Sequence, residues 1–531
     1  LPGLIYAKPF FPGATYDAAV PTPDSVLGFP VGSRPANHAQ IEAVIKAIAA
    51  KSPRVKLFEY GKTHVGRTLY YAVIASPERI KALDELKADY AKLADPRQAP
   101  AADIDALITK LPALAWMAYV IHGDELSGSD ASLAVLHHLA ASNDADVKTL
   151  LDNLVVVIDP LMNPDGRDHW LIDAAHSRTK QPQVDDQSLM HSGIWPSGRM
   201  NHYLFDMNRD WIFATQPESR GRIAAVRDWN PHYFMESHEM GSQDSFLFMP
   251  AREAINPNHS PSTQKWVAVF GREQAAAFDT QGWRYYTGEW NDDWYPGYSS
   301  SWAGLRGSIQ NLYEQAAINV DAVRRPEGAL EPYRESVHKQ LISSMANLAT
   351  LAKNRAAVLT DFVADRRKVM SDDSAYAKRT FAVIPTANTT RLNQFLDLLT
   401  IQGFEFTRAE KPFTTDALDR LGVSRPAQAF PAGTILIPNR QPLARLLAAM
   451  LEFDPRMSPE YLTTERRELL RFGRSKIYDI TGWSIPMLFD VETFQLAAFP
   501  TDADAKPLTF AAPAPSKPTL PETTVGYAIN G

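Results

Sequence analysis

The feature that most constrains the fold is an apolar run over residues 114–121, which ends at His122 and is followed by Glu125. A continuous apolar run of this length predicts a strand that is buried on both faces. Open α/β sheets bind their ligands just beyond the carboxyl ends of the strands. We therefore expect His122 and Glu125 to lie at one edge of a sheet, where they are the first candidates for a metal site.

Similar strands recur along the chain and alternate with helices. Strands are predicted at residues 55–60, 69–75, 154–158, 233–236 and 308–313, and helices after Asn37 and at residues 77–110 and 129–141. Apolar strands that alternate with helices indicate an α/β fold, with a mixed, mostly parallel twisted sheet and helices on both faces.

A second unit is predicted farther along the chain. Apolar residues at helical spacing predict a long helix or helix pair over residues 332–370. Strand and helix patterns then resume, with strands at 381–384 and 434–437 and helices at 390–401 and 442–451. We expect an N-terminal arm (1–36), a main domain (37–331), a helical connector (332–374), a smaller α/β domain (375–510) and a Pro-rich C-terminal segment (511–531) that contains a short strand at 525–529.

Composition limits the possible partners and ligands. A chain of 531 residues exceeds one ordinary domain, and its 45% hydrophobic and 22% charged residues are typical of a folded protein. The formal charge of −7, without a long basic run, argues against nucleic acid or an anionic membrane as the main partner. No window is apolar enough to predict a membrane span. Because the chain has no Cys, any metal must be held by His and carboxylate side chains.

The first residues, Leu1-Pro2-Gly3, lack an initiator Met and a signal-peptide pattern. We therefore expect an exported protein, periplasmic or secreted, whose signal has been cleaved. The sequence does not indicate an oligomeric state.

A second histidine turns the His-x-x-Glu spacing into a candidate metal site. That spacing is common by chance, but here it follows a predicted buried strand, and His238 lies at the end of another. Two His and one Glu leave zinc one open position for water or substrate. Three ligands from two strand ends favour a catalytic site over a structural one.

Further motifs follow in a fixed order. Asn-Pro-Asp-Gly occurs at residues 163–166, Asp-Met-Asn-Arg at 206–209, Ser-His at 237–238 and a strand-end Glu at 314. Together with His-x-x-Glu, this order closely resembles the zinc carboxypeptidases of the M14 type over about residues 40–330. The resemblance implies that His122, Glu125 and His238 hold Zn²⁺ and that Glu314 is the general base that takes a proton from the attacking water.

The resemblance also implies cationic groups for the substrate. Asn208 and Arg209 match the pair that binds the substrate's C-terminal carboxylate. For the arginine that stabilises the oxyanion, the chain offers Arg199, Arg178 and Arg167. We favour Arg199, because Arg-x-Asn followed by Asp-x-Asn reproduces the pattern of bacterial family members.

The family places a mobile tyrosine shortly before the base, and Tyr295 and Tyr298 are the candidates here. They lie in a turn-rich, aromatic segment that could serve as a lid. For four tryptophans of the same region, hydrophobic packing and a substrate wall are equally good interpretations: Trp283, Trp290, Trp294 and Trp302.

The sequence departs from the family pattern in two places. Residues 169–202 form a polar, His-rich insertion, which we expect at the rim of the cleft. We interpret its histidines as rim or solvated residues rather than as a metal cluster: His169, His176, His191 and His202. The residues after Glu314, Gln315-Ala316-Ala317, also differ, so the substrate preferences of digestive relatives are not carried over.

The C-terminal half resembles the flavodoxin-like, class I amidotransferase-like domain found in larger bacterial M14-like proteins. Residues 478–484 fit that resemblance. The absence of Cys excludes amidotransferase chemistry by a cysteine nucleophile.

The expected function is a zinc metallocarboxypeptidase that hydrolyses the C-terminal bond of peptides with a free carboxylate. One alternative is a zinc amidase or deacylase that acts on N-acyl amino acids or cell-wall peptides. Another is a peptide-binding module without catalysis. Side-chain specificity depends on the residues that line the cleft, which the sequence does not identify.

Overall fold

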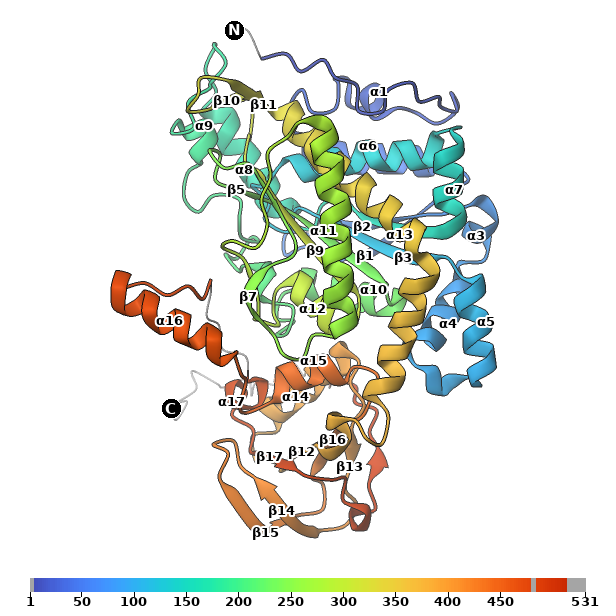
Figure 1. Ribbon diagram of the computed structural model, residues 1–531, viewed down its shortest axis with the longest axis vertical. Coiled ribbons are helices and arrows are strands. Elements are labelled where there is room, and N and C mark those ends of the chain that lie inside the picture. The colour runs from blue at the N-terminus through green and yellow to red at the C-terminus, as the bar shows by residue number, and fades with distance from the viewer. Residues whose placement is uncertain (1–3, 479–483, 513–531) are drawn as a thin grey trace, which may run out of the picture.

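A seven-stranded sheet organises the first part of the chain in the computed structural model, which describes residues 4–478 and 484–512 (Figure 1). The strand order is β1-β2-β4-β3-β5-β9-β6. The strands are β1 (Val55–Lys62), β2 (Thr68–Ile74), β3 (Ala113–Tyr119), β4 (Leu154–Asp159), β5 (Tyr233–Met240), β6 (Phe246–Phe248) and β9 (Ile309–Ala316). The strands β3 and β4 are buried along their whole length because helices cover both faces of the sheet.

Parallel pairing is confined to the middle of this sheet. The pairs β4·β3, β3·β5 and β5·β9 are parallel, whereas β1·β2, β2·β4 and β6·β9 are antiparallel. The carboxyl ends of β3, β5 and β9 therefore meet at one edge. The predicted fold class, a mixed sheet with helices on both faces, is confirmed.

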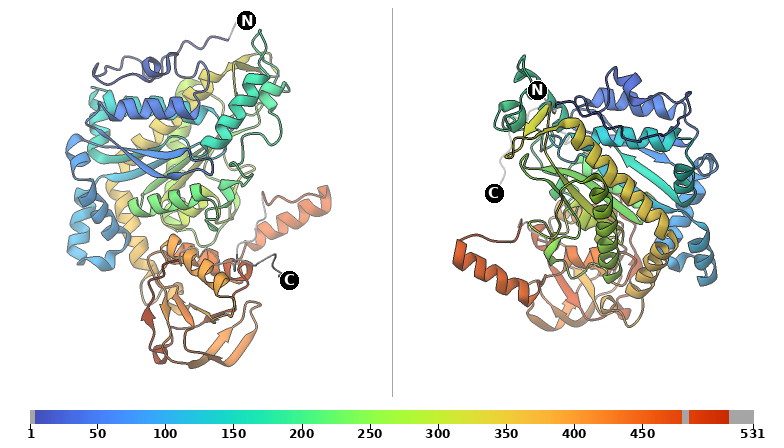
Figure 2. Two further views of the ribbon diagram at one scale, coloured as in Figure 1. Left: turned by 180° about the vertical axis from the view of Figure 1, so that it is seen from behind. Right: turned by 45° about the horizontal axis from the view of Figure 1, so that its top comes forward.

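Alternating side chains of β5 show how helices cover the two faces. Ser237 contacts Gln340 of α13 (Tyr333–Val369), whereas Glu236 accepts a hydrogen bond from the backbone of Ser300 in α12 (Ser299–Leu305). Successive residues of a strand point to opposite faces, so α12 and α13 lie on opposite sides of the sheet. The helices α6 (Ser127–Ala141) and α11 (Pro261–Gln281) pack against α13. The helix α10 (Pro217–Trp229) lies on the same side of the sheet as α12 (Figures 1 and 2).

The remaining helices of this part are short. They are α2 (His38–Ala49), α3 (Pro77–Lys81), α4 (Leu83–Ala94), α5 (Ala101–Lys110), α7 (Ala145–Asn153), α8 (Pro164–His176) and α9 (Leu189–Ser192). The start of α2 illustrates the local signals: Asn37 and Gln40 form a capping box, and four apolar residues at helical spacing are buried beneath it. The first turn of α8 begins with Pro164, and the Asn163 side chain accepts from the Gly166 N–H.

An arm of residues 4–36, which contains α1 (Pro23–Leu27), lies over α6 and the start of α13 (Figure 1). The Phe11 ring stacks on His138 with centroids 3.6 Å apart, and the Tyr6 hydroxyl lies 2.8 Å from Nδ1 of His338. Aromatic contacts with both helices therefore hold the arm against the main sheet's helical cover.

Beyond α13, a second sheet has the order β15-β14-β17-β12-β16-β13-β18. Its strands are β12 (Thr380–Val383), β13 (Thr407–Arg408), β14 (Phe413–Leu418), β15 (Ser424–Phe430), β16 (Ile435–Pro438), β17 (Thr493–Leu496) and β18 (Lys506–Pro507). Its helices are α14 (Thr389–Gln402), α15 (Ala444–Leu451), α16 (Pro459–Phe472) and α17 (Ile485–Leu488). Two further strand pairs occur in the described residues: β7 (Arg252–Ile255) with β8 (Asp292–Asp293), and β10 (Ala322–Arg324) with β11 (Leu330–Pro332).

The flavodoxin-like expectation for this second unit is corrected by its strand pairing. In the described residues, all strand pairs of the second sheet are antiparallel. A flavodoxin-like sheet is parallel. The strand and helix patterns correctly predicted β12, α14, β16 and α15, but such local patterns do not encode strand direction. Most of residues 478–484 and 511–531, including the predicted strand at 525–529, lies outside the described residues.

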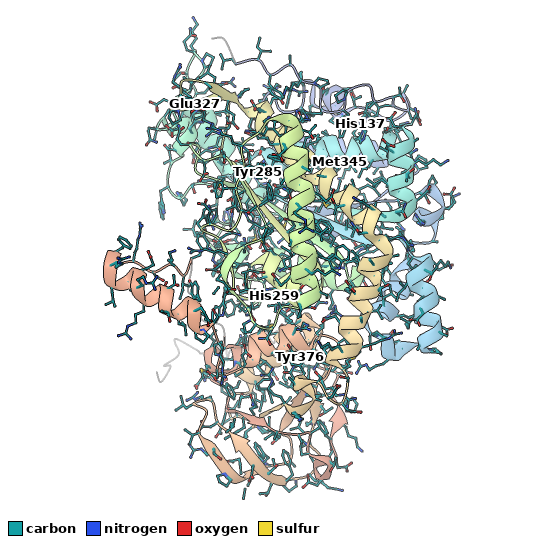
Figure 3. The ribbon with its side chains drawn as sticks, in the orientation of Figure 1. His137, His259, Tyr285, Glu327, Met345 and Tyr376 are labelled. Atoms are coloured by element: carbon teal, nitrogen blue, oxygen red, sulfur yellow. The ribbon has the colours of Figure 1, made fainter. Side chains whose placement is uncertain are left out.

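Buried polar contacts join the two units. The side chain of Gln402 accepts from Trp302 Nε1 at 2.8 Å and donates to the Trp211 carbonyl at 2.7 Å. Arg445 of α15 forms an ion pair with Asp365 of α13, at 2.6 Å between Nη2 and Oδ1. Tyr376, which donates to Asn258, lies at this junction below His259 (Figure 3). In the described parts of the chain, no helix is both long enough and apolar enough to cross a bilayer.

Candidate active site

The chain leaves β3 through a strained residue just before His122. Val120 has a φ of 59°, which is unusual for a β-branched side chain, and it is fully buried. Such a conformation costs on the order of 1–3 kcal/mol and persists only where the surroundings hold it. Here the Val120 carbonyl accepts from the Asn163 N–H at 3.1 Å. The Asn-Pro-Asp-Gly segment thus fixes the turn that carries His122 and Glu125.

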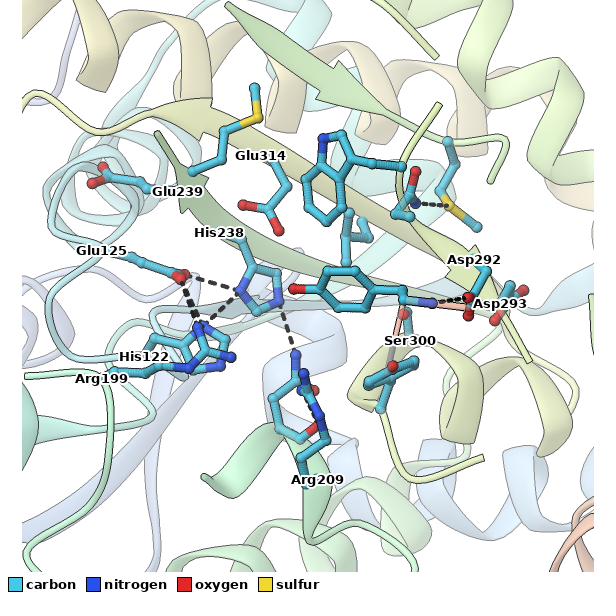
Figure 4. A pocket seen from close by; sticks show the side chains of 18 residues that line it. His122, Glu125, Arg199, Arg209, His238, Glu239, Asp292, Asp293, Ser300 and Glu314 are labelled. Carbon is cyan, nitrogen blue, oxygen red and sulfur yellow. Dashed lines mark hydrogen bonds and ion pairs between the residues drawn. The ribbon is translucent and has the colours of Figure 1, made fainter. Parts of the chain in front are cut away.

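Three buried side chains converge at this edge of the sheet: His122, Glu125 and His238 (Figure 4). The two Nδ1 atoms of the histidines are 3.2 Å apart. The Glu125 carboxylate reaches both rings, at 2.6 Å from His122 and 2.9 Å from His238. Burial alone would raise the pKa of Glu125, but the two histidines lower it below its usual range. Glu125 is therefore held as a carboxylate, the form that binds a metal.

The spacing of these donor atoms fits zinc. A tetrahedral zinc site with bonds of about 2.0–2.1 Å places neighbouring donors about 3.3 Å apart. The observed separation of the two Nδ1 atoms, 3.2 Å, matches that edge. The residues present therefore fit a zinc ion held by two His and one Glu.

The other nitrogen of each imidazole ring faces a carboxylate. His122 Nε2 lies 3.3 Å from Asp206, and His238 Nε2 lies 3.0 Å from Glu236. Such partners orient a ligating imidazole and fix its tautomer. Burial would raise the pKa of Asp206, but His122 and Arg199 lower it well below its usual range. The role of Glu236 was missed from sequence, although a carboxylate two residues before His238 shares its face of the strand.

Glu314 stands beside the three donors without joining them. It is the register partner of His238 on the neighbouring parallel strand, so the two side chains emerge on the same face. Burial raises the pKa of Glu314 well above its usual value; His238 opposes this shift and Glu125 adds to it. A buried carboxyl with a raised pKa next to a metal site has the properties of a general base.

The three candidate oxyanion arginines occupy different places. Arg199 lies in the pocket, 3.2 Å from His122 Nδ1, and donates to Asp206 at 2.9 Å. Arg167 is fully buried and donates to the carbonyls of Ala36 and Leu126. Arg178 lines a separate cleft. The geometry therefore brings only Arg199 of the three to the candidate metal site.

Asn208 and Arg209 both line the same pocket. The Asn208 oxygen accepts from the backbone and hydroxyl of Ser299 at 2.8 and 2.9 Å. These bonds fix the amide orientation and direct Nδ2 toward His238. The Arg209 guanidinium lies over the Tyr298 ring, 4.7 Å from its centroid.

The two lid candidates differ in position. Tyr298 lines the pocket, whereas Tyr295 does not, and the Tyr295 hydroxyl donates to the Arg209 carbonyl at 3.0 Å. Among the four tryptophans of the region, Trp290 lines the pocket. Trp302 is fully buried and packs on Trp211 with centroids 4.8 Å apart, which is a core role.

The insertion histidines are not brought together. In the described residues, the group of three or more possible metal-binding side chains is His122, Glu125 and His238 alone. His191 is buried and contacts the Gln183 carbonyl, and His169 lies 3.4 Å from Asp173.

The pocket around these groups has a volume of about 140 Å³. Besides the donors and arginines, it is lined by Glu239, Asn291, Asp292, Asp293, Ser300 and Tyr478. Tyr478 comes from the second unit of the chain, so both units contribute to the pocket wall.

Comparison with known proteins decides the family. The family described as zinc carboxypeptidase matches residues 41–311, which is half of the chain and contains the three donors as well as Arg199, Asn208 and Arg209. The chain belongs to the zinc carboxypeptidase family. This member of the family is therefore a zinc metallopeptidase.

Solved structures of carboxypeptidases resemble this member of the zinc carboxypeptidase family at low sequence identity. A metallo-carboxypeptidase from Burkholderia cenocepacia is 16% identical over 62% of this chain and 70% of its own, with a TM-score of 0.41. Carboxypeptidase A from Helicoverpa armigera is 17% identical over 63% and 80%, also with a TM-score of 0.41. A search of curated proteins found no match.

Proposed function

We propose that the protein is a metallocarboxypeptidase that removes the C-terminal residue of peptides with a free carboxylate. The observation that carries the proposal is the convergence of His122, Glu125 and His238 on one point, with Glu314 on the adjacent strand and Arg209 in the same pocket. A peptidase that trims C-termini needs this combination of a metal centre, a base and a cation for the carboxylate.

Nδ1 of His122, Nδ1 of His238 and the Glu125 carboxylate would hold the zinc ion, with Asp206 and Glu236 orienting the imidazoles. When bound, zinc supplies a Lewis acid that polarises the scissile carbonyl and lowers the pKa of a water molecule.

Glu314 is the proposed general base. It accepts a proton from the attacking water and transfers it to the nitrogen of the leaving amino acid. Its position beside His238 satisfies the requirement that the base be near the metal centre without being a ligand. Burial keeps bulk water away from the carboxylate, so that the proton is retained for the leaving group.

Two arginines have separate proposed roles. Arg209, with Asn208, binds the terminal carboxylate of the substrate and so sets which peptide bond faces Glu314. Arg199 lies nearer the donors and stabilises the negative charge that develops on the carbonyl oxygen. Tyr298 is the proposed lid residue, since it lines the pocket beside Arg209.

Paired peptides test the proposal. One peptide carries a free C-terminal carboxylate, and the other has the same sequence with a C-terminal amide. The zinc-loaded protein should release one residue from the free acid and cleave the amide much more slowly, as followed by mass spectrometry. Equal cleavage of both peptides, or cleavage at internal bonds, would contradict a carboxypeptidase.

A further inference from the structure

One end of the pocket is acidic and lies away from the metal-binding side. Asp292 and Asp293 form β8 and line the pocket. Figure 4 shows them on the opposite side from Glu125 and Arg199, with His238 between. We call Trp290, Asn291, Asp292 and Tyr478 the acidic end.

The two aspartates are not equivalent. Asp293 is occupied by structural partners, since it accepts from Ser301 and from Gln310 at 2.7 Å and lies 3.2 Å from His259. Asp292 accepts from the Tyr478 N–H at 3.0 Å. Within residues 4–478 and 484–512, no Lys, Arg or His nitrogen forms an ion pair with Asp292. Asp292 is thus a buried carboxylate without a cationic partner among those residues.

The surroundings of Asp292 make a cation favourable there. Burial raises its pKa to about 6, although hydrogen bonds from the Tyr478 and Trp294 backbone and the charge of Arg252 oppose the shift. Next to it, the side-chain oxygen of Asn291 is buried without a hydrogen-bond partner in the described structure, while its amide faces the Met249 sulfur at 3.8 Å. A buried acceptor left unpaired costs about 1–3 kcal/mol. Both residues line the pocket, so each acceptor faces the space that a substrate side chain would enter.

Two aromatic rings complete the acidic end. The rings of Trp290 and Tyr478 have centroids 5.2 Å apart, and both residues line the pocket. Aromatic faces attract ammonium and guanidinium groups, and they also pack against the methylene stems of Lys and Arg.

We propose that the acidic end binds a cationic side chain, Lys or Arg, on the C-terminal residue of the substrate, with Asp292 and Asn291 as acceptors and Trp290 and Tyr478 as walls. This inference rests on the proposed carboxypeptidase function. An apolar side chain in the same place would leave the carboxylate and the amide oxygen desolvated without a partner, so it should bind less well.

The experiment compares benzoylglycyl dipeptides ending in Arg, Lys, Phe or Glu, using the zinc-loaded full chain. The Arg and Lys substrates should exceed Phe in kcat/KM by about 10- to 100-fold, the effect of a charge-assisted hydrogen bond, and Glu should be poorest. Asp292→Asn keeps the acceptor for the Tyr478 N–H and should remove most of the Arg-over-Phe preference. Asp372→Asn, at a 90% exposed side chain, is the charge-matched control and should keep it.

A second pair of variants covers the case in which Asp292→Asn does not fold. Tyr478→Phe keeps the ring and should keep the preference, whereas Tyr478→Ala should lower it severalfold; Tyr478 is 48% exposed, so neither change opens the core. A wild type that prefers Phe, or variants that change all substrates equally, would overturn the inference.

Failure of the inference can be separated from failure of the proposed function. If no dipeptide is cleaved, calorimetry compares binding of Nα-benzoyl-arginine and Nα-benzoyl-phenylalanine. Preferential binding of the arginine compound that Asp292→Asn abolishes would support the acidic end and overturn the carboxypeptidase proposal. Binding without preference would overturn both.

Discussion

His238 and Glu314 are register partners on the adjacent parallel strands β5 and β9, although they are far apart in the chain. Because partners on neighbouring strands project to the same face, the sheet itself sets the distance between a proposed zinc ligand and the proposed base. No loop has to position either side chain. This rigid placement is what preorganised catalytic groups require.

Gly123 should be essential for the metal centre. A Cβ at this residue would lie 2.2 Å from the backbone nitrogen of Arg167, so the segment between His122 and Glu125 would have to shift. Gly123→Ala should cost about 1–3 kcal/mol of stability and weaken zinc binding. Zinc affinity from a chelator competition checks this. Gly241→Ala, where nothing lies within 4 Å, is the matched control and should bind zinc normally.

Glu236 should act through His238 rather than on the substrate. Glu236→Gln should lower zinc affinity by about 10- to 100-fold, the usual effect of removing a carboxylate that orients a ligating histidine. The activity of the variant should recover as zinc is added. Glu239→Gln tests the specificity of the effect, because Glu239 is equally part of β5 but contacts Ser127. Equal zinc affinities of the two variants would contradict the assigned role.

The two pocket arginines should separate kinetically. Arg199→Gln should lower kcat by about 10²–10³-fold, as for loss of one oxyanion donor. Arg209→Gln should mainly raise KM, by about 10- to 100-fold, because it removes charge-assisted bonds to the substrate carboxylate. Arg209→Lys keeps the charge but not the planar fork and should fall between. The assignment fails if Arg199→Gln changes only KM.

The Asp365–Arg445 pair should stabilise the junction between the two units. Both side chains are less than a tenth exposed. Arg445→Met leaves the buried carboxylate with Arg366 at 4.0 Å and the Ser260 hydroxyl as its remaining partners, so we expect a cost of about 3 kcal/mol in the free energy of unfolding, the low end of the range for a broken buried pair. The double variant Asp365→Asn/Arg445→Met should recover part of that loss in urea denaturation.

The Asp365–Arg445 pair also predicts how the stability of the protein changes with pH. Burial would raise the pKa of Asp365, but Arg445 lowers it below its usual value. A lowered folded-state pKa contributes stability above the unfolded value of about 3.9, and this contribution is lost as the pH falls through the folded value. Between about pH 5 and pH 3, the wild type should therefore lose more stability than the double variant. An equal loss of stability in the two proteins would show that the pair does not make stability depend on pH.

Local sequence patterns predicted the helices and strands better than they predicted how the strands pair. The apolar runs that become β3 and β4 are nearly continuous, and both strands are buried along their whole length, so sequence and burial agree. The prediction of a flavodoxin-like, parallel second sheet was wrong, because its strands pair antiparallel. Short apolar runs look the same in parallel and antiparallel strands, so the sequence pattern does not distinguish them. The helix α11 was missed, and its apolar residues are diluted by polar ones that face solvent.

For the candidate site, motif order identified the residues that the fold brings together. The proposed ligands and base come from three strand ends, which a parallel sheet gathers at one edge. The acidic end was not predicted, because Asp292 and Tyr478 meet only through packing between the two units. No spacing in the sequence encodes that contact.

The most direct test of the account measures zinc content and hydrolysis together in the wild type and in Glu314→Gln. Both proteins should bind one zinc ion, because the three donors remain, and the variant should lose about 10²–10⁴-fold in kcat. Glu327→Gln, at an exposed carboxylate, serves as the control and should behave as wild type. A zinc-free wild type, or a Glu314→Gln protein with undiminished turnover, would contradict the central claim.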